Sequence, residues 1–291
     1  MIPRVTVLMA AYNHEPWVAE AIESVLAQET TFPVRLVIFE DCSTDRTREI
    51  VLSHAARLPD TIHVVLSEHN RDFGKWAEAA RTAEGEYLAV LDADDFWTSP
   101  RKLQAQVEFM DEHRDCAISF HDLQVVGKDS LHVRKKQDVY TFEDLLLGNF
   151  IPWSSSMYRL RIVSALPEWY ESVLFSDWAF ELLNARSGVI REMPGTYGVY
   201  RYHGRGVWSG MPRKAQIAEL ISFTEDVAKR FEMENAPVIK RALAEHWCSL
   251  AIQHRKEKNF REMVRCGRRA LGLARWNARV ALRLAAASIR G

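Results

Sequence analysis

The chain has 291 residues, of which 47% are hydrophobic and 26% are charged. Such values are ordinary for a folded globular protein and exclude a disordered chain. The four cysteines show neither metal-ligand spacing nor a disulfide framework, and the sequence shows neither a signal peptide nor an apolar run of roughly 20 residues, so we expect a cytoplasmic protein in a reducing setting.

The net charge of −1 conceals two regions of opposite charge. Residues 1–212 carry 21 basic and 31 acidic side chains, whereas residues 213–291 carry 17 basic and 8 acidic ones. This difference indicates two differently built parts of the chain. We do not expect nucleic-acid binding, because the acidic first region would repel phosphate.

Short apolar runs alternate with amphipathic segments over the first 95 residues. The apolar runs predict strands over 5–10, 35–40, 62–67 and 87–92, and the segments between them predict helices over 15–28, 44–58 and 73–85, the last with Gly85 as its stop. This βαβαβαβ order predicts a doubly wound, mostly parallel sheet. Ligands of such sheets bind beyond the carboxyl ends of the strands, where Asn13, Glu40, Asp41 and residues 92–95 fall.

The pattern continues with a helix over residues 99–113, in which Ser99 is the expected N-cap. A further strand is predicted over 116–126 and a further helix over 176–188. From residue 213 onward the pattern is almost wholly helical. We therefore expect an α/β domain with an all-helical C-terminal appendage.

Three carboxylates follow the last of the early apolar runs directly, in AVLDADDFW (89–97). Asp92 and Asp94 form a D-x-D pattern, whose hard oxygen ligands can hold Mg²⁺ or Mn²⁺ and leave positions for substrate phosphates. A calcium-binding EF-hand loop is excluded because the glycine and the glutamate that it needs are missing. The alternative is a cluster stabilised by the dipole of the following helix, a role that we assign to Asp95.

Acidic and small residues also follow the first two predicted strands. Glu40 and Asp41 open the segment EDCSTD, where a carboxylate can accept hydrogen bonds from a ribose or a base. Capping of the next helix by Ser43 or Thr44 is compatible with that role. After the first strand, AAYNH (10–14) offers small residues where a nucleotide can approach the backbone. Glycine-rich dinucleotide and phosphate loops do not follow any predicted strand, so a metal would have to neutralise a bound diphosphate.

Four motifs in this order resemble family 2 glycosyltransferases of the GT-A fold, over residues 4–210. They are VTVLMAAYNHEPWVAEAIESVLAQ, LVIFEDCSTDRT, RDFGKWAEAARTAEGEYLAVLDADDFW and SDWAFELL. The resemblance implies inverting, metal-dependent transfer of one sugar from a nucleoside-diphosphate sugar, expected to be UDP-linked, to an acceptor hydroxyl. It also implies a GT-A-type sheet flanked by helices, with Mn²⁺ or Mg²⁺ as the cofactor.

The resemblance carries site residues over to this sequence. Ala11 and Tyr12 correspond to the nucleotide contacts after the first strand, Asp41 to the base or ribose contact, and Asp94 to the direct metal ligand. The nucleotide-sugar-binding residues that it implies are Ala11, Tyr12, Asn13, Glu40, Asp41, Lys75, Asp92, Ala93 and Arg205.

Two positions depart from the family pattern. Ala10 replaces the usual proline before the first-strand motif, a change that should leave backbone contacts intact. Ser176 and Asp177 replace the Glu-Asp pair of the catalytic helix, so Asp177 is the predicted general base, with Glu181 one turn later as the fallback. The alternative for Asp177 is a charge that only stabilises the N-terminus of its helix.

The segment YRYHGRGVW (200–208) supplies further candidates. In related enzymes a histidine near this point can complete the metal site, so His203 is a predicted metal ligand, and the alternative is a structural histidine. Arg205 or Arg201 is a predicted charged donor to the diphosphate. Trp153, in NFIPWSSSMYR, offers a face on which an acceptor sugar can stack, although tryptophan is also ordinary core material. The Q-x-x-R-W motif of processive members does not occur in the sequence, which favours single addition over polymerisation.

We expect residues 1–98 to form a nucleotide-sugar half and 99–212 an acceptor half of one domain, followed by a basic helical region over 213–291. Past Glu262 that region has seven arginines and no acidic residue. One interpretation is a peripheral helix over 263–290 on the anionic inner face of a membrane, near a lipid-linked saccharide acceptor. The others are packing on the acidic domain and a contact between the subunits of a homo-oligomer.

Two other functions stay open at this point. A nucleotidyltransferase that makes the sugar nucleotide would use similar acidic metal ligands, but it would be expected to carry a glycine-rich phosphate loop in place of AAYNH. A non-catalytic sugar-nucleotide-binding or glycan-binding relative would not need Asp92, Asp94 and Asp177. The function that we expect is a hexosyltransferase in bacterial surface polysaccharide or glycoconjugate assembly.

Overall fold

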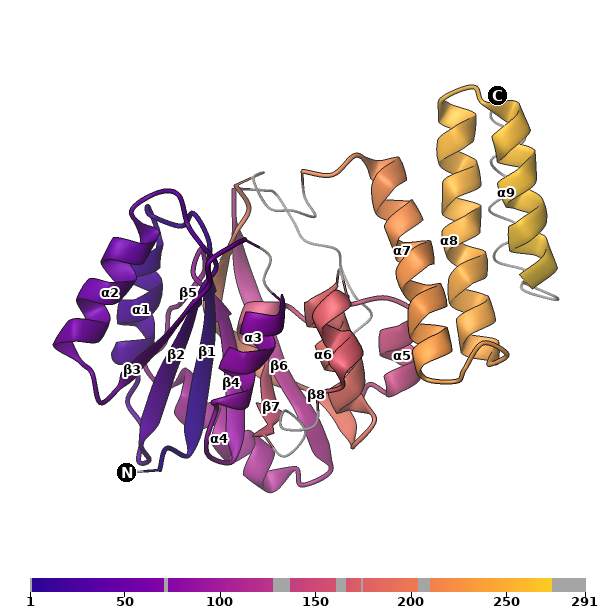
Figure 1. Cartoon of the computed structure of the whole chain (residues 1–291). Helices are drawn as coiled ribbons and strands as arrows, with labels where there is room; N and C mark the ends of the chain where they lie inside the picture. Colours follow the sequence, from indigo (N-terminus) through magenta and orange to yellow (C-terminus); the bar gives the residue numbers. More distant parts are fainter. Residues whose placement is uncertain are drawn as a thin grey trace. The chain divides into compact units, whose positions relative to one another are not determined.

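The computed structural model describes residues 2–70, 73–127, 137–160, 166–173, 175–203 and 210–273 (Figure 1). The chain forms two compact units. The first unit contains residues 1–142 and 150–202, and the second contains 143–149 and 203–291. The first holds the sheet and all the acidic motifs, and the second is helical.

The first half of the sheet is parallel, as the sequence predicts. Its elements are β1 (Val5–Ala11), α1 (Val18–Leu26), β2 (Val34–Glu40), α2 (Thr47–Arg57), β3 (Ile62–Leu66), α3 (Phe73–Arg81) and β4 (Tyr87–Asp92). Strand β1 lies between β2 and β4, and β3 pairs with β2. The strands are continuous apolar runs because both faces of β1 and β4 are buried. We call β1 to β4 with their helices the parallel half.

The second half of the sheet mixes strand directions. Its elements are β5 (Phe96–Trp97), α4 (Lys102–Glu112), β6 (Cys116–Val126), the short helix η1 (Trp153–Ser155), β7 (Met157–Arg159), the short helix η3 (Glu168–Ser172), α6 (Ser176–Ala185) and β8 (Val189–Arg201). The eight strands follow the order β3-β2-β1-β4-β7-β6-β8-β5. Strand β7 is antiparallel to β4 and β6, β6 and β8 are parallel, and β5 is antiparallel to β8. We call this part the mixed half.

The expected start of the helix after the acidic cluster is wrong. Helix α4 begins at Lys102, two residues after the expected first position at Pro100, and Ser99 Oγ accepts the Arg101 backbone N–H at 3.3 Å in the turn that precedes the helix. The reason is β5, which pairs Phe96 with Val199 of β8 and holds the chain extended past the cluster. The backbone N–H of Thr98 then donates to Tyr197 O (2.9 Å), which delays the first helical turn further.

Two other expected helix signals act differently from the prediction. The N-terminus of α2 is not capped by Ser43 or Thr44; Asp45 Oδ1 accepts the Thr47 backbone N–H at 2.9 Å. Gly85 does not end α3, which stops at Arg81. A Cβ at Gly85 would lie 2.4 Å from Pro3 O, and its φ of +107° suits glycine, so this residue serves the close approach of two backbone segments.

The second unit confirms the helical prediction over its described part. Helices α7 (Arg213–Arg230), α8 (Pro237–Lys256) and α9 (Phe260–Leu273) follow one another, and α5 (Phe142–Leu146) contributes most of its residues to this unit. Helices α8 and α9 form a hairpin and lie side by side (Figure 1). Arg265 and Arg268 of the expected basic helix lie in α9, whereas Arg275, Arg279, Arg283 and Arg290 lie outside the described residues. Within the described part of the chain, the helices are too short or too polar to cross a lipid bilayer.

Candidate active site

The three predicted carboxylates lie in one turn at the carboxyl end of β4. Asp92 is the last residue of the strand, and the backbone N–H of Asp95 donates to Asp92 O at 3.0 Å to close the turn. The buried Ala93 anchors the turn to β1, because its N–H donates to Ala10 O at 2.9 Å. One carboxylate oxygen from each of Asp92, Asp94 and Asp95 lies within 4.8 Å of the others.

The proximity of these carboxylates makes their simultaneous ionisation costly. Burial, and then repulsion from Asp94, Asp95 and Asp177, raises the pKa of Asp92 well above its usual value. Burial and repulsion from Asp94 raise the pKa of Asp95 to about 7. Burial and the same carboxylates raise the pKa of Tyr200, in β8, to about 12. A divalent cation would relieve this repulsion, and the oxygen donor set suits Mg²⁺ or Mn²⁺.

Asp95 has a different role from the one expected, because it does not serve the next helix. Its Oδ2 accepts a hydrogen bond from Ser154 Oγ at 2.6 Å, and its Oδ1 accepts the backbone N–H of Arg201 at 2.9 Å. Ser154 Oγ also accepts the backbone N–H of Asp92 at 3.2 Å, and Ser154 O accepts Trp97 Nε1–H at 2.8 Å. Asp95 thereby ties the acidic turn to η1 and to β8.

Asp94 faces His14, which is not among the site residues predicted from the sequence. His14 Nε2 lies 3.6 Å from Asp94 Oδ2, and both side chains are about one fifth exposed. The backbone N–H of His14 donates to Thr47 Oγ1 at 2.8 Å, and its ring packs edge-on against Trp17. The signal that could have found it is its place beside Asn13, in the segment already assigned to the nucleotide rim.

Arg201 holds the acidic turn from the other side. Its Nη1 donates to Asp94 O at 2.7 Å, its Nη2 donates to Glu20, and its guanidinium lies 4.4 Å from the ring centroid of Phe96. These contacts position the guanidinium within the protein. Because the guanidinium already has these protein partners, a contact between Arg201 and a diphosphate stays a prediction.

The first two rim segments are tied to each other. Asn13 has a φ of 54°, its N–H donates to Ser43 Oγ at 3.0 Å, and its Oδ1 accepts the Thr44 N–H at 2.8 Å. Ala11 is buried, and its carbonyl accepts the backbone N–H of Asp41 at 2.9 Å. These bonds fix the two loops against each other.

The side chains that a nucleotide could meet on this rim differ in exposure. Tyr12 is 38% exposed and Asp41 is half-buried, so both are accessible to a ligand. Glu40 is fully buried; one oxygen pairs with Arg48 and the other accepts the Ser43 N–H at 2.8 Å. Both oxygens of Glu40 therefore serve the protein itself, which makes Asp41 the better candidate for the nucleoside.

Asp177 lies in the first turn of α6 and interacts electrostatically with the acidic turn. Burial raises the pKa of Asp177, and the backbone N–H groups of Trp178 and of Asp177 itself offset part of that rise. A carboxylate with a raised pKa is a suitable general base. Glu181, the fallback one turn later, is fully buried, so Asp177 is better placed to meet a substrate.

The remaining predicted site residues stay predictions. Trp153 is half-buried, and its ring centroid lies 6.3 Å from that of Trp76 and 6.0 Å from that of Phe180. His203 is the first residue of the second unit's main segment. The side chain of Lys75 and all of Arg205 lie outside what the structure describes.

Residues 6–166 match the family model described as glycosyl transferase family 2. Rv1520 of Mycobacterium tuberculosis, an uncharacterized protein, is 32% identical over 210 residues, which are 70% of this chain and 60% of that protein. The succinoglycan biosynthesis protein ExoO of Rhizobium meliloti is 34% identical over 162 residues, which are 54% of this chain and 44% of ExoO. The chain thus spans about 60% or less of the length of these relatives.

Two solved structures share the fold. TarS 1-349 of S. aureus in complex with UDP-GlcNAc superposes with a TM-score of 0.62 and 18% identity, covering 89% of each chain. The mannosyltransferase PcManGT of Pyrobaculum calidifontis, in complex with GDP-Man and Mn²⁺, gives a TM-score of 0.59 and 16% identity, covering 100% of this chain and 87% of that one. The likeness confirms the expected α/β sheet flanked by helices, of the GT-A type.

Proposed function

Because the chain belongs to glycosyl transferase family 2, we propose that it transfers a single sugar from a nucleoside-diphosphate sugar to an acceptor hydroxyl. The donor that we favour is UDP-linked, since the TarS structure holds UDP-GlcNAc. The acceptor that we favour is a saccharide or lipid-linked saccharide of surface polysaccharide assembly, since the relative ExoO is a succinoglycan biosynthesis protein.

The observation that carries the proposal is the electrostatic interaction of Asp177 with the acidic turn. The two elements are far apart in the sequence, yet repulsion from Asp177 is one cause of the raised pKa of Asp92. A general base and a cluster of carboxylates that could hold a metal are the two kinds of group that sugar transfer from a diphosphate donor requires, and here they lie close enough to interact electrostatically.

The acidic turn fits a divalent cation. Three carboxylate oxygens lie within 4.8 Å of one another, and a cation bound among them would reduce the repulsion between their negative charges. Asp94 is the proposed direct ligand, with Asp92 beside it and His14 Nε2 as a neighbouring donor 3.6 Å from Asp94. When bound, the cation would neutralise the charge that develops on the leaving diphosphate.

The chain's own residues supply the remaining steps. Tyr12 and Asp41 bind the nucleoside at the carboxyl ends of β1 and β2, where the Asn13 and Ser43 contacts hold the loops in place. Asp177 accepts the proton of the acceptor hydroxyl as the hydroxyl oxygen bonds to the anomeric carbon and the bond to the diphosphate breaks. Attack from the face opposite the diphosphate inverts the configuration at that carbon.

A donor panel tests the binding step. Nucleotide sugars are added to the full chain with Mn²⁺ and without it, and unfolding is followed by thermal shift, because a ligand that binds only the folded state raises the melting temperature. One UDP-sugar should raise the melting temperature only when Mn²⁺ is present, and Asp94→Ala should abolish that rise. Asp60→Asn, an exposed acidic position, is the control and should behave as the native chain does.

The configuration of the product tests the transfer step. With the donor found in the panel and a saccharide acceptor, proton NMR of the first product should show an anomeric configuration opposite to that of the donor. Retention of configuration would refute Asp177 as a general base for direct displacement.

A further inference from the structure

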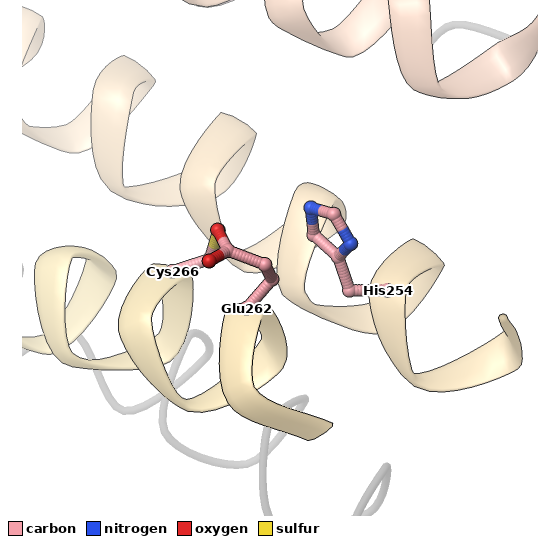
Figure 2. Close-up of side chains that lie close together, drawn as sticks. All are labelled: His254, Glu262 and Cys266. Carbon is pink, nitrogen blue, oxygen red and sulfur yellow. The ribbon is translucent and has the colours of Figure 1, made fainter. Parts of the chain in front are cut away.

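A second cluster of metal-ligating side chains lies in the helical hairpin of α8 and α9, within the second unit alone. His254 comes from the last turn of α8, and Glu262 and Cys266 come from α9. One ligand atom from each lies within 4.8 Å of the others. Figure 2 shows the three side chains converging between the two helices.

The hairpin builds this cluster from short-range geometry. Glu262 and Cys266 are four residues apart, so they lie one above the other on the same face of α9. The turn before α9 is fixed by the backbone N–H of Asn259, which donates to His254 O at 2.9 Å. Asn259 Oδ1 in turn accepts the Glu262 N–H at 3.3 Å. The three side chains therefore converge because the turn fixes where α8 ends and where α9 begins.

These side chains are unusual occupants of a helix interface. His254 is 8% exposed and Cys266 is 1% exposed, whereas the Glu262 side chain retains 26% of its exposure. Most other buried residues of α8 and α9 are small or apolar, such as Ala251 and Ala270. A histidine and a carboxylate among such residues cost solvation free energy unless a partner compensates them.

The two nitrogens of His254 face different surroundings. Nδ1 is buried, has no hydrogen-bond partner within bonding distance, and lies 3.9 Å from Glu257 Oε2. The other nitrogen, Nε2, lies on the side of the Glu262 carboxylate in Figure 2. A proton on Nδ1 would leave the lone pair of Nε2 directed at the cluster, and Glu257, whose Oε2 also accepts from Lys214 Nζ at 2.8 Å, is the acidic side chain on the Nδ1 side. Metal-bound histidines commonly have such a carboxylate behind them.

We propose that His254 Nε2, a Glu262 carboxylate oxygen and Cys266 Sγ form a binding site for a divalent transition metal of the zinc class. The N, O and S donors are those that Zn²⁺ takes in tetrahedral sites, with water in the fourth position. On binding, the Cys266 S–H bond gives its proton to solvent and the sulfur–metal bond forms in its place. Burial raises the pKa of the Cys266 thiol, so the metal has to drive that deprotonation.

The geometry needs only a small adjustment to hold the ion. Metal–nitrogen and metal–sulfur distances of about 2.0 and 2.3 Å place tetrahedral ligand atoms roughly 3.5 Å apart. The atoms of the cluster lie within 4.8 Å of one another, so side-chain rotations of the three ligands would have to bring them to that spacing. Arg265, which pairs with Glu262 at 3.0 Å, competes weakly because its side chain is 68% exposed. A bound ion would link the end of α8 to the start of α9.

Cobalt substitution tests the site in the full chain. Tetrahedral Co²⁺ with a thiolate ligand gives a sulfur-to-metal charge-transfer band that carboxylates cannot give, so the Asp92–Asp95 turn does not contribute to it. We expect one Co²⁺ per chain with this band, and we expect Zn²⁺ to displace it. Asp94→Ala should leave the band unchanged, which separates this site from the proposed donor site.

Matched variants assign the ligands. Cys266→Ala and His254→Ala should abolish the band, whereas Cys248→Ala, at another buried position of α8, and His246→Ala, at a half-buried one, should retain it. Glu257→Gln should weaken Co²⁺ binding about 10-fold or more, as loss of a carboxylate behind a ligating histidine does. Circular dichroism shows whether each variant is folded.

Three results would overturn the proposal. They are a folded native chain that gives no band, a band that persists in Cys266→Ala, and a band that disappears in Cys248→Ala instead. If Cys266→Ala does not fold, Glu262→Gln decides between the outcomes, because this substitution keeps the size of a side chain that is 26% exposed. Unchanged Co²⁺ affinity in that variant would remove Glu262 from the site and refute the three-ligand arrangement.

Discussion

The two halves of the sheet build their parts of the site in different ways. In the parallel half, the loops are held by residues close to the strands that they follow, such as Asn13 with Thr44 and Glu40 with Ser43. In the mixed half, Asp95 bonds to Ser154, 59 residues away, and Arg201 bonds to Asp94, 107 residues away. The parallel half thus supplies a preformed rim, and the mixed half completes and positions the acidic turn.

This difference has a consequence for mutational effects. A change in the parallel half should affect nucleotide binding and the stability of the loops, because those side chains bond to one another. A change in the mixed half should affect the charged groups themselves, because Ser154, Arg201 and Asp177 act on the acidic turn.

The largest effect should come from Asp177→Asn in the mixed half. Loss of the general base should lower kcat about 10²- to 10⁴-fold. The donor-induced thermal shift should persist, because the donor is bound by the parallel half and the acidic turn. Initial rates of transfer at varied donor concentration measure both quantities. The matched control in the parallel half is Asp41→Asn, which should raise the donor KM more than it lowers kcat; the reverse pattern would contradict the division.

The next effect should come from the buried ion pair of the parallel half. Arg48→Met leaves Glu40, fully buried, without its cationic partner. We expect the free energy of unfolding to fall by about 3 kcal/mol, the lower end for breaking a buried pair, since Arg48 is itself one third exposed. Urea denaturation measures the change. Arg46→Met, which removes an exposed pair with Glu49 at the same end of α2, should leave the midpoint nearly unchanged.

A smaller effect should come from Ser154→Ala in the mixed half. The variant removes the hydroxyl that donates to Asp95 and accepts the Asp92 N–H. Leaving these buried groups without that partner should cost about 1–3 kcal/mol of unfolding free energy. Transfer should also slow, since the hydrogen bond from Ser154 lowers the pKa of Asp95. Ser172→Ala, whose hydroxyl bonds to Trp169 O at an exposed position, is the control. Equal urea midpoints for the two variants would contradict the role of Ser154.

The same division explains how much the sequence predicted. Every strand of the parallel half was predicted within one residue at each end, because buried parallel strands are continuous apolar runs. In the mixed half, β6 was predicted at its full length, but β5 and β7, of two and three residues, are too short to show periodicity.

Some residues of the candidate site could be predicted from the sequence and others could not. Asp92, Asp94 and Asp177 could be selected because they lie at strand and helix ends in recognisable motifs. Ser154 could not be selected, since its position beside Asp95 depends on a contact between segments far apart in the chain. Asp95 was misassigned to the next helix for the same reason, because only the pairing of β5 with β8 shows that the helix begins later.

The last effect that we predict concerns acid sensitivity, and it also belongs to the mixed half. His121, fully buried in β6, has a pKa lowered to about 3 by burial and by the nearby charge of Lys102. Between that value and the ordinary histidine pKa of about 6.5, the unfolded chain binds a proton that the folded chain does not. The folded state should therefore lose about 1.4 kcal/mol for each pH unit on acidification from about 6.5 toward 3.

His121→Phe tests this prediction, because it removes the titrating group and keeps a ring against Tyr197. The variant's urea midpoint at pH 7.5, where the histidine is neutral in both states, measures the packing cost alone. Between pH 6.5 and 4.5 the midpoint should then fall less steeply in the variant than in the native chain. If the urea midpoints of the two chains fall equally with pH, His121 does not cause the loss of stability in acid, and the prediction is refuted.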